Sequence, residues 1–173
     1  MRRGTLLPLL LCGCLAYAQK KEDAPPTHRE QAAELLTRAG DMVAATRPEV
    51  QAAALIHLGD TWIALDKKKA LEFFDQAVAA LPLVSEKNFN DTLRTALISA
   101  AAEADPDYAA GLLASIPDAP AQAVDRIVSG LLQQKKATRA MGVVNTVAAT
   151  GPYPFRAVQR ILEALPADDE HRL

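Results

Sequence analysis

The sequence predicts an all-α protein, a short solenoid of stacked antiparallel helix pairs that ends in a capping helix. Three observations predict this fold. Apolar residues recur at helical spacing over most of the chain, no stretch alternates with period two over the length of a strand, and prolines recur at a nearly constant interval. Alanine is abundant, and it favours helix because it loses no side-chain entropy there.

The proline interval sets the length of the repeat. Pro48, Pro82, Pro117 and Pro152 are 34, 35 and 35 residues apart. Proline lacks the backbone donor and clashes inside a helix, so it marks helix ends. A constant period near 34 residues is typical of stacked helix pairs.

Apolar positions between these prolines repeat as well. The first helix after Pro48 carries one apolar face, and the same spacing returns in two later helices: Leu55, Leu58 and Trp62; Val124, Ile127 and Leu131; Val158, Ile161 and Leu165. The intermediate copy has Leu93 and Leu97 but places Asn90 in the first slot. Second helices also correspond, as Ala70, Phe74 and Ala77 match Ala140, Val144 and Val147. We therefore expect these residues in the core.

The helices follow from these faces and from capping signals. Thr27 with Glu30 predicts a capping box, and Asp105 before Pro106 predicts another helix start. Residues 28–166 are expected to form the repeat domain and residues 167–173 a disordered tail. The expected helices are a lone helix at 28–46, the pairs 49–65 with 67–81, 88–104 with 106–116 and 120–134 with 136–150, and a lone capping helix at 153–165.

One copy resembles a known family. The residues Leu58-Gly59, Trp62, Ala70, Phe74, Ala77 and Pro82 look like the signature of a tetratricopeptide repeat, although the two halves are one residue closer than in that pattern. The other copies keep the period and the apolar positions only. The resemblance implies a right-handed solenoid whose first helices line a concave surface. It implies little about function.

The first eighteen residues predict export. Arg2 and Arg3 precede an apolar run from Leu6 to Leu15, and small residues close the segment at Ala16-Tyr17-Ala18. This is the order of a secretory signal peptide, and the apolar run is too short for a permanent membrane span. We expect cleavage after Ala18, residues 19–27 as a flexible linker, and a periplasmic or secreted protein.

A second interpretation of the leader leads to a lipid anchor. Leu11-Cys12-Gly13-Cys14 resembles a bacterial lipobox, in which Cys14 would be lipidated and become the first residue. Both routes place the protein outside the cytoplasm, and lipidation also tethers it to the bacterial envelope.

Charge, cysteine content and hydropathy limit the kinds of partner and the membrane topology that we expect. Cleavage after Ala18 leaves 173 − 18 = 155 residues without cysteine, and removing two arginines leaves 17 basic residues against 21 acidic ones. There is no basic stripe, so we expect no nucleic-acid partner. No second long apolar run exists, so we expect no membrane span.

Candidate chemistry is sparse. His57 and Asp60 stand one helical turn apart but lack a third ligand, and Glu72 with Asp75 is the pattern of a solvated helix face. We therefore expect no catalytic, metal or cofactor site. The run 67–69 of three lysines suggests a solvated turn or, alternatively, contact with an anionic surface. The run 90–92 has the form of a glycosylation acceptor, which we interpret as a helix start.

These patterns favour a binding scaffold for a protein or peptide, with a tethered structural component of the envelope as the alternative. Carrying the tetratricopeptide pattern over from Gly59 gives a concave face that mixes apolar and acidic residues with one arginine, Arg156. Such a face would prefer a segment with apolar and basic side chains. The positions expected on it are Ala53, Ile56, Asp60 and Ile63; Asn88, Asp91, Thr95 and Ile98; Gln122, Asp125, Ser129 and Leu132; and Arg156, Gln159 and Glu163.

Overall fold

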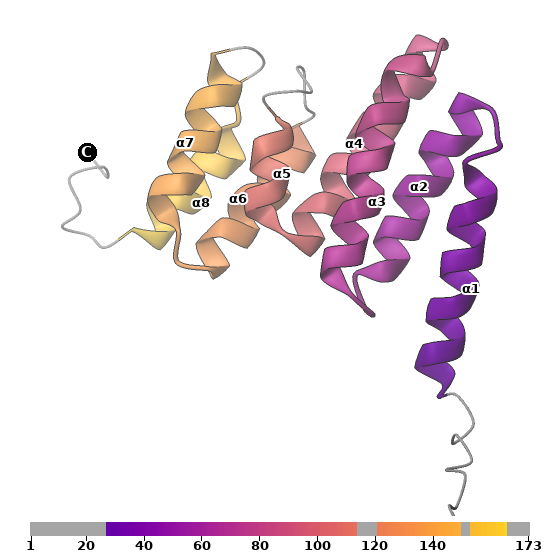
Figure 1. Ribbon diagram of the computed structural model, residues 1–173. Helices are drawn as coiled ribbons and strands as arrows, with labels where there is room; N and C mark the ends of the chain where they lie inside the picture. Colours follow the sequence, from indigo (N-terminus) through magenta and orange to yellow (C-terminus); the bar gives the residue numbers. More distant parts are fainter. Residues whose placement is uncertain (1–26, 114–120, 150–152, 166–173) are drawn as a thin grey trace, which may run out of the picture.

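The computed structural model describes residues 27–113, 121–149 and 153–165, and within these ranges the protein is all-helical without a strand. Figure 1 shows the helices side by side in chain order, from α1 at one end to α7 and α8 at the other. The helices are α1 (His28–Val43), α2 (Pro48–Trp62), α3 (Lys67–Ala80), the 3-10 turn η1 (Leu81–Leu83), α4 (Lys87–Ala104), α5 (Pro106–Leu112), α6 (Ala121–Gln133), α7 (Ala137–Ala148) and α8 (Phe155–Ala164).

Packing joins helices that are close in the chain. The antiparallel neighbours α2 with α3, α4 with α5 and α6 with α7 form packed pairs, and α1 packs on α2. The helices α2, α4, α6 and α8 also contact one another in that order. The core therefore continues from each pair to the next.

The helices match the sequence-based expectation closely. Six lie inside their expected ranges, and α2 and α4 begin one residue earlier. The expected capping box is present, with the Thr27 side chain accepting from the Glu30 backbone and the Glu30 side chain accepting from the Thr27 backbone. Asp105 caps α5 by accepting from the backbone of Asp107 at 2.8 Å. Residues 1–26 and 166–173, with Cys14, the leader and the tail, lie outside the described residues, as do Pro117 and Pro152.

The core contains the residues that the apolar repeat predicts. Trp62 is 4% exposed, and Phe74, Leu97, Ile127 and Ile161 are fully buried. Val158 and Leu165, near the end of the described chain, are half-buried. The other repeat positions that are buried are Leu55, Leu58, Ala70, Ala77, Leu93, Val124, Leu131, Ala140, Val144 and Val147.

A close approach between α2 and α3 requires glycine at position 59. A Cβ atom built on Gly59 would lie 2.4 Å from Cε1 of Phe74, well inside van der Waals contact. The absent side chain lets the Phe74 ring pack directly on the α2 backbone. One turn further on, Trp62 stacks on Phe73 with ring centroids 6.5 Å apart, and the Lys69 ammonium lies 5.0 Å from the Trp62 ring centroid.

Asn90 has a structural role that the apolar repeat alone does not reveal. Its amide nitrogen donates to the carbonyl oxygens of Leu81 at 2.7 Å and Val84 at 3.3 Å, and the residue is 9% exposed. Asn90 therefore holds the turn between α3 and α4 against α4. Residues 90–92, which we interpreted as a helix start, lie in the first two turns of α4, which begins at Lys87 and is capped by Glu86.

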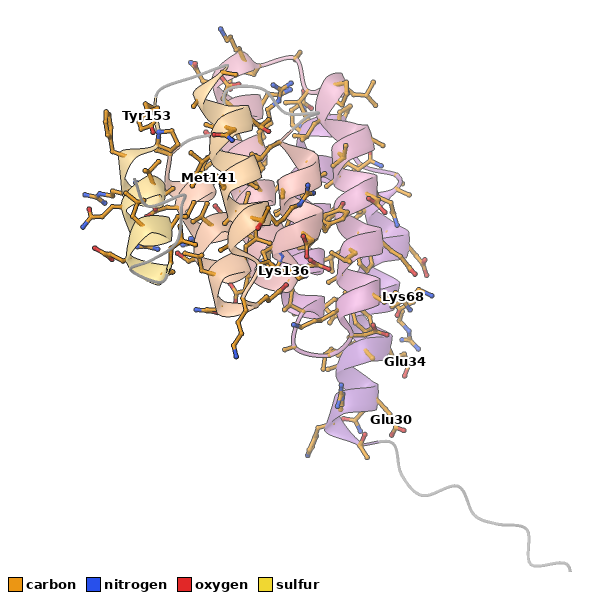
Figure 2. All side chains as sticks on the ribbon, turned by 90° about the vertical axis from the view of Figure 1, so that its left-hand side faces the viewer. Glu30, Glu34, Lys68, Lys136, Met141 and Tyr153 are labelled. Atoms are coloured by element: carbon orange, nitrogen blue, oxygen red, sulfur yellow. The ribbon has the colours of Figure 1, made fainter. Side chains whose placement is uncertain are left out.

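Polar contacts join the second helices of successive pairs. The Tyr108 hydroxyl on α5 donates to the Asp75 carboxylate on α3 at 2.7 Å. Lys136, labelled in Figure 2, donates to the Asp107 carboxylate, and Arg139 lies 3.5 Å from the same group. These contacts connect α3 to α5 and α5 to the start of α7. They fix the order of the pairs along the side that α3, α5 and α7 form.

Candidate functional site

We call the surface formed by α2, α4, α6 and α8 the first-helix face. An apolar hollow and a polar hollow open along it. The apolar hollow measures about 600 Å³ and lies between α2 and α4. Val50 and Phe89 are 50% and 38% exposed at its edge, and Ile56, only 6% exposed, belongs to its floor. Its lining residues are Glu49, Val50, Ala53, Ala54, Ile56, His57, Phe89, Leu93 and Ala96.

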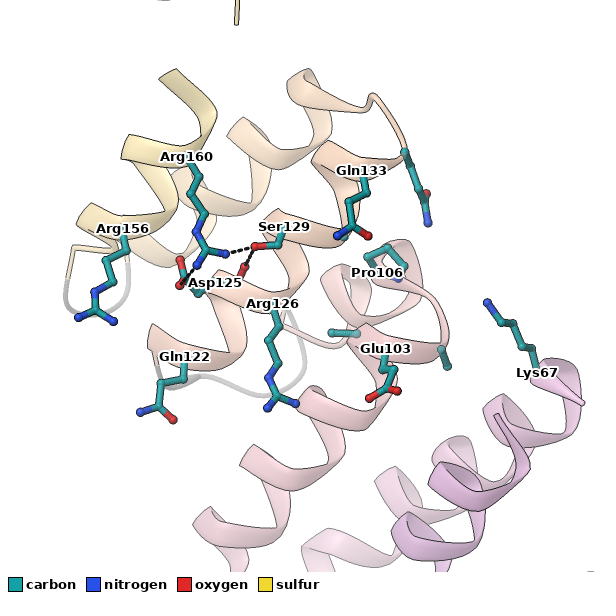
Figure 3. A pocket seen from close by; sticks show the side chains of 14 residues that line it. Lys67, Glu103, Pro106, Gln122, Asp125, Arg126, Ser129, Gln133, Arg156 and Arg160 are labelled. Atoms are coloured by element: carbon teal, nitrogen blue, oxygen red, sulfur yellow. Dashed lines mark hydrogen bonds and ion pairs between the residues drawn. The ribbon is translucent and has the colours of Figure 1, made fainter. Parts of the chain in front are cut away.

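The polar hollow measures about 830 Å³ and lies among α4, α6 and α8 (Figure 3). Gln122, Asp125 and Ser129, all expected on the binding face, line it together with Arg156. Four basic side chains stand in it against two carboxylates. The charged residues are Lys67, Arg126, Arg156 and Arg160, and Glu103 and Asp125.

Arg160 neutralises the acidic residue expected here. Its guanidinium lies 3.3 Å from the Asp125 carboxylate and also donates to the Ser129 hydroxyl. That hydroxyl in turn donates to the Asp125 backbone carbonyl at 2.7 Å, so the three residues join α8 to α6 (Figure 3). The expectation of an acidic face with one arginine therefore differs from the charge found at this end of the molecule, where basic groups dominate.

The remaining expected residues do not gather at either hollow. Asp60 and Asp91 are exposed, and Thr95 is half-buried and donates to the Asp91 carbonyl at 2.9 Å. Gln159 and Glu163 are exposed on α8, and the Gln159 side-chain amide donates a hydrogen bond to the Glu163 carboxylate at 2.8 Å. Asn88 is exposed as well. Packing buries the other three to differing degrees: Ile63 and Leu132 are partly buried against the core, and Ile98 is fully buried.

Two aromatic residues border the polar hollow and were not anticipated. Tyr153 and Phe155 meet edge to face, with ring centroids 4.7 Å apart, and are 50% and 75% exposed. A smaller hollow of about 270 Å³ includes both rings and shares Gln122, Asp125 and Arg156 with the polar hollow. The smaller hollow is therefore adjacent to the polar hollow. Tyr153 lies at the end of the molecule that carries α7 and α8 (Figure 2).

Three described residues have shifted pKa values, and none of them lines the apolar, the polar or the smaller hollow. Burial, with a hydrogen bond to Asp75, raises the pKa of Tyr108, and the bond from Lys136 lowers the pKa of Asp107. Backbone and side-chain bonds from Thr27 lower the pKa of Glu30. The Tyr108 shift follows mainly from burial, and the shifts of Asp107 and Glu30 follow from a contact that joins helices and from one that caps a helix. No cluster of three metal-ligating side chains occurs in the part of the chain that the structure describes.

Comparisons with protein families, with curated proteins and with solved structures gave no match to this chain. Of the helices in the described ranges, none is long and apolar enough to cross a membrane. Along the first-helix face Val50 and Phe89 expose apolar side chains at one hollow, and Arg126 and Arg156 form no ion pair with another described residue at the other.

Proposed function

We propose that this chain is an exported helical-repeat scaffold, a short right-handed solenoid of tetratricopeptide-like pairs that binds a segment of a partner protein on its first-helix face without catalysis. The order of packing supports the solenoid, since each pair contacts the next through its first helix. The repeat of buried positions at intervals near 34 residues supports it too.

The apolar hollow carries the proposal. Val50 and Phe89 expose apolar surface at a concavity between two helices, beside Ala53 and Ala96, whose small side chains leave room for an occupant. A concavity of about 600 Å³ lined by apolar groups fits one or two bulky side chains from a peptide. Helical segments commonly anchor to such surfaces through side chains one turn apart.

Selection from a displayed library of random peptides tests the proposal directly. The full chain should select peptides rich in apolar residues, and Val50→Asp should weaken their binding at least about tenfold because it places a charge in the apolar hollow. Gln76→Asp is the matched control. Gln76 is exposed on α3, away from the first-helix face, and its substitution should leave the dissociation constant unchanged.

Two results would overturn the proposal. One is failure to select any peptide with a correctly folded chain, as judged by circular dichroism. The other is equal loss of binding in the Val50 and Gln76 variants, which would place the peptide elsewhere or show a nonspecific effect of charge.

Export is the second part of the proposal and rests on the sequence alone. The order of Arg2, Arg3, the apolar run and Ala16-Tyr17-Ala18 supports cleavage after Ala18. Lipidation at Cys14 is the alternative and would make the protein a tethered envelope component. Intact mass of the protein from its host distinguishes these outcomes, since the chain would begin at Gln19 or at a lipid-modified Cys14. Full-length soluble protein that retains Met1 would contradict both.

A further inference from the structure

Two arginines in the polar hollow form no ion pair with another described residue. Arg126 on α6 and Arg156 on α8 are exposed, and neither forms an ion pair with any residue in the ranges 27–113, 121–149 and 153–165. In the view of Figure 3 the side chains of Arg156, Gln122 and Arg126 lie in that order from left to right, and all three extend downwards. Arg160, which Asp125 and Ser129 hold in place, differs from them in this respect.

The exposed rings of Tyr153 and Phe155 line a hollow together with Arg156. Phe155 and Arg156 are consecutive, and both line the smaller hollow together with Tyr153. Exposed aromatic and arginine side chains are the residue types that contribute most to binding free energy at protein interfaces. We call the set of Arg126, Arg156, Tyr153 and Phe155 the arginine–aromatic site.

We propose that the arginine–aromatic site binds an acidic segment of a partner protein. Carboxylates of that segment pair with Arg126 and Arg156, and a bulky apolar side chain packs on the rings of Tyr153 and Phe155. This inference rests on the proposed function and names the chemistry of one end of the first-helix face. The sequence pattern predicted a partner segment with basic side chains. At this end of the face we instead infer a partner segment with acidic side chains.

Charge complementarity favours a carboxylate-bearing peptide. A guanidinium presents two parallel donors that match a carboxylate, which makes arginine a strong partner for aspartate and glutamate. The whole chain has a formal net charge of −2, whereas the polar hollow carries four basic side chains against two carboxylates, so an acidic segment is attracted to this hollow more than to the average surface of the chain. A nucleic acid needs a longer row of cations than the hollow provides.

The experiment measures binding of labelled peptides to the full chain by fluorescence anisotropy. The probe is the peptide Asp-Glu-Phe-Glu-Leu-Asp, and its partners carry Asn and Gln, or Lys, in place of each acidic residue. We expect the acidic probe to bind at least about tenfold more tightly than the amide version. Added salt should weaken the acidic probe more than the amide version, because salt screens charge pairs.

Substitutions in the arginine–aromatic site test whether the peptide binds there. Arg126→Glu and Arg156→Glu should each weaken the acidic probe about tenfold or more, and the double variant should prefer the lysine peptide. Phe155→Ser should weaken the acidic and amide versions alike. Lys87→Glu is the matched control, since it makes the same charge change at an exposed position at the start of α4 and should leave binding unchanged.

Three results would overturn the inference: equal binding of the acidic and amide peptides, unaltered binding in both arginine variants, and arginine-dependent binding of phosphatidylglycerol vesicles without binding of the peptide. If library peptides still bind through Val50 while the acidic probe does not, this inference fails and the proposed function stands. If neither kind of peptide binds the folded chain, both fail.

Discussion

The Phe74 ring packs against the backbone of Gly59 so closely that a methyl group at position 59 would overlap Cε1 and Cδ1 of the ring. Both residues are buried, and Phe74 is fully so, which leaves the ring no free space to move into. The glycine costs α2 some intrinsic helix stability, and the close packing of α2 on α3 offsets that cost.

Alanine substitutions at two helical glycines should therefore have opposite effects. Gly59→Ala should destabilise the protein by about 1–3 kcal/mol, as expected for overpacking in a core. Gly142→Ala on α7 meets nothing within 4 Å of the new Cβ, so its higher helix propensity should stabilise the protein by up to about 1 kcal/mol. Urea unfolding followed by circular dichroism measures both, and equal effects of the two changes would contradict the packing described for Gly59.

Asn90 should resist replacement by the apolar residue that its repeat position suggests. Asn90→Leu removes the amide donor from the Leu81 and Val84 carbonyls, and we expect a loss of about 1–3 kcal/mol in the free energy of unfolding. Asn88→Ala, at a neighbouring exposed position, should change stability by about 0.5 kcal/mol or less. A leucine variant as stable as the parent in the same urea titration would show that the turn does not need the amide.

The ion pairs of Asp107 should make stability depend on pH. Its pKa in the folded protein is lowered from the usual 3.8, mainly by the hydrogen bond from Lys136. A lowered pKa means that the contribution is complete above the unfolded pKa and is lost as the pH falls through the folded pKa. Asp107→Asn should therefore be less stable than the parent near pH 6, with the difference shrinking towards about pH 2. Asp41→Asn, at an exposed position on α1, should lack this trend.

Trp62, the only tryptophan in the sequence, reports on the packing between α2 and α3. Because it is 4% exposed, its emission should be blue-shifted in the folded protein and should move to longer wavelength on unfolding. Trp62→Ala should cost about 3–5 kcal/mol, while Trp62→Phe, which keeps a ring against Phe73, should cost less. Emission of the native protein at the wavelength of a fully hydrated indole would contradict this burial.

The helices and the core could be predicted from the sequence because both depend on local periodicity. Proline spacing and one apolar face per helix suffice to place Leu55, Phe74 and Ile127 in the interior, and the structure confirms all three. Asn90 shows where periodicity stops being informative. A polar residue in an apolar slot is visible in the sequence, but the carbonyls that it satisfies belong to a turn whose path depends on tertiary packing.

The charge of the candidate site depends on contacts between helices that are far apart in the chain. Asp125 is acidic in the sequence, yet Arg160, 35 residues later, neutralises it across α6 and α8. Arg126 and Arg156 become one site only because these two helices pack together. Extending a family pattern from Gly59 predicted Gln122, Asp125 and Ser129 on a concave binding face, and these residues line the polar hollow. The pattern carried no information about which charges in that hollow would lack an ion-pair partner.

The order of helix packing has a consequence for how fast the chain folds. Each helix in the described ranges packs mainly on helices that are one or two helices away in the chain, so the loops that folding must close are short compared with the whole chain. Loop-closure entropy is small for such contacts, and helical proteins dominated by local contacts fold in microseconds to milliseconds. We infer a short-lived unfolded state, with little time for its apolar helix faces to associate with other chains.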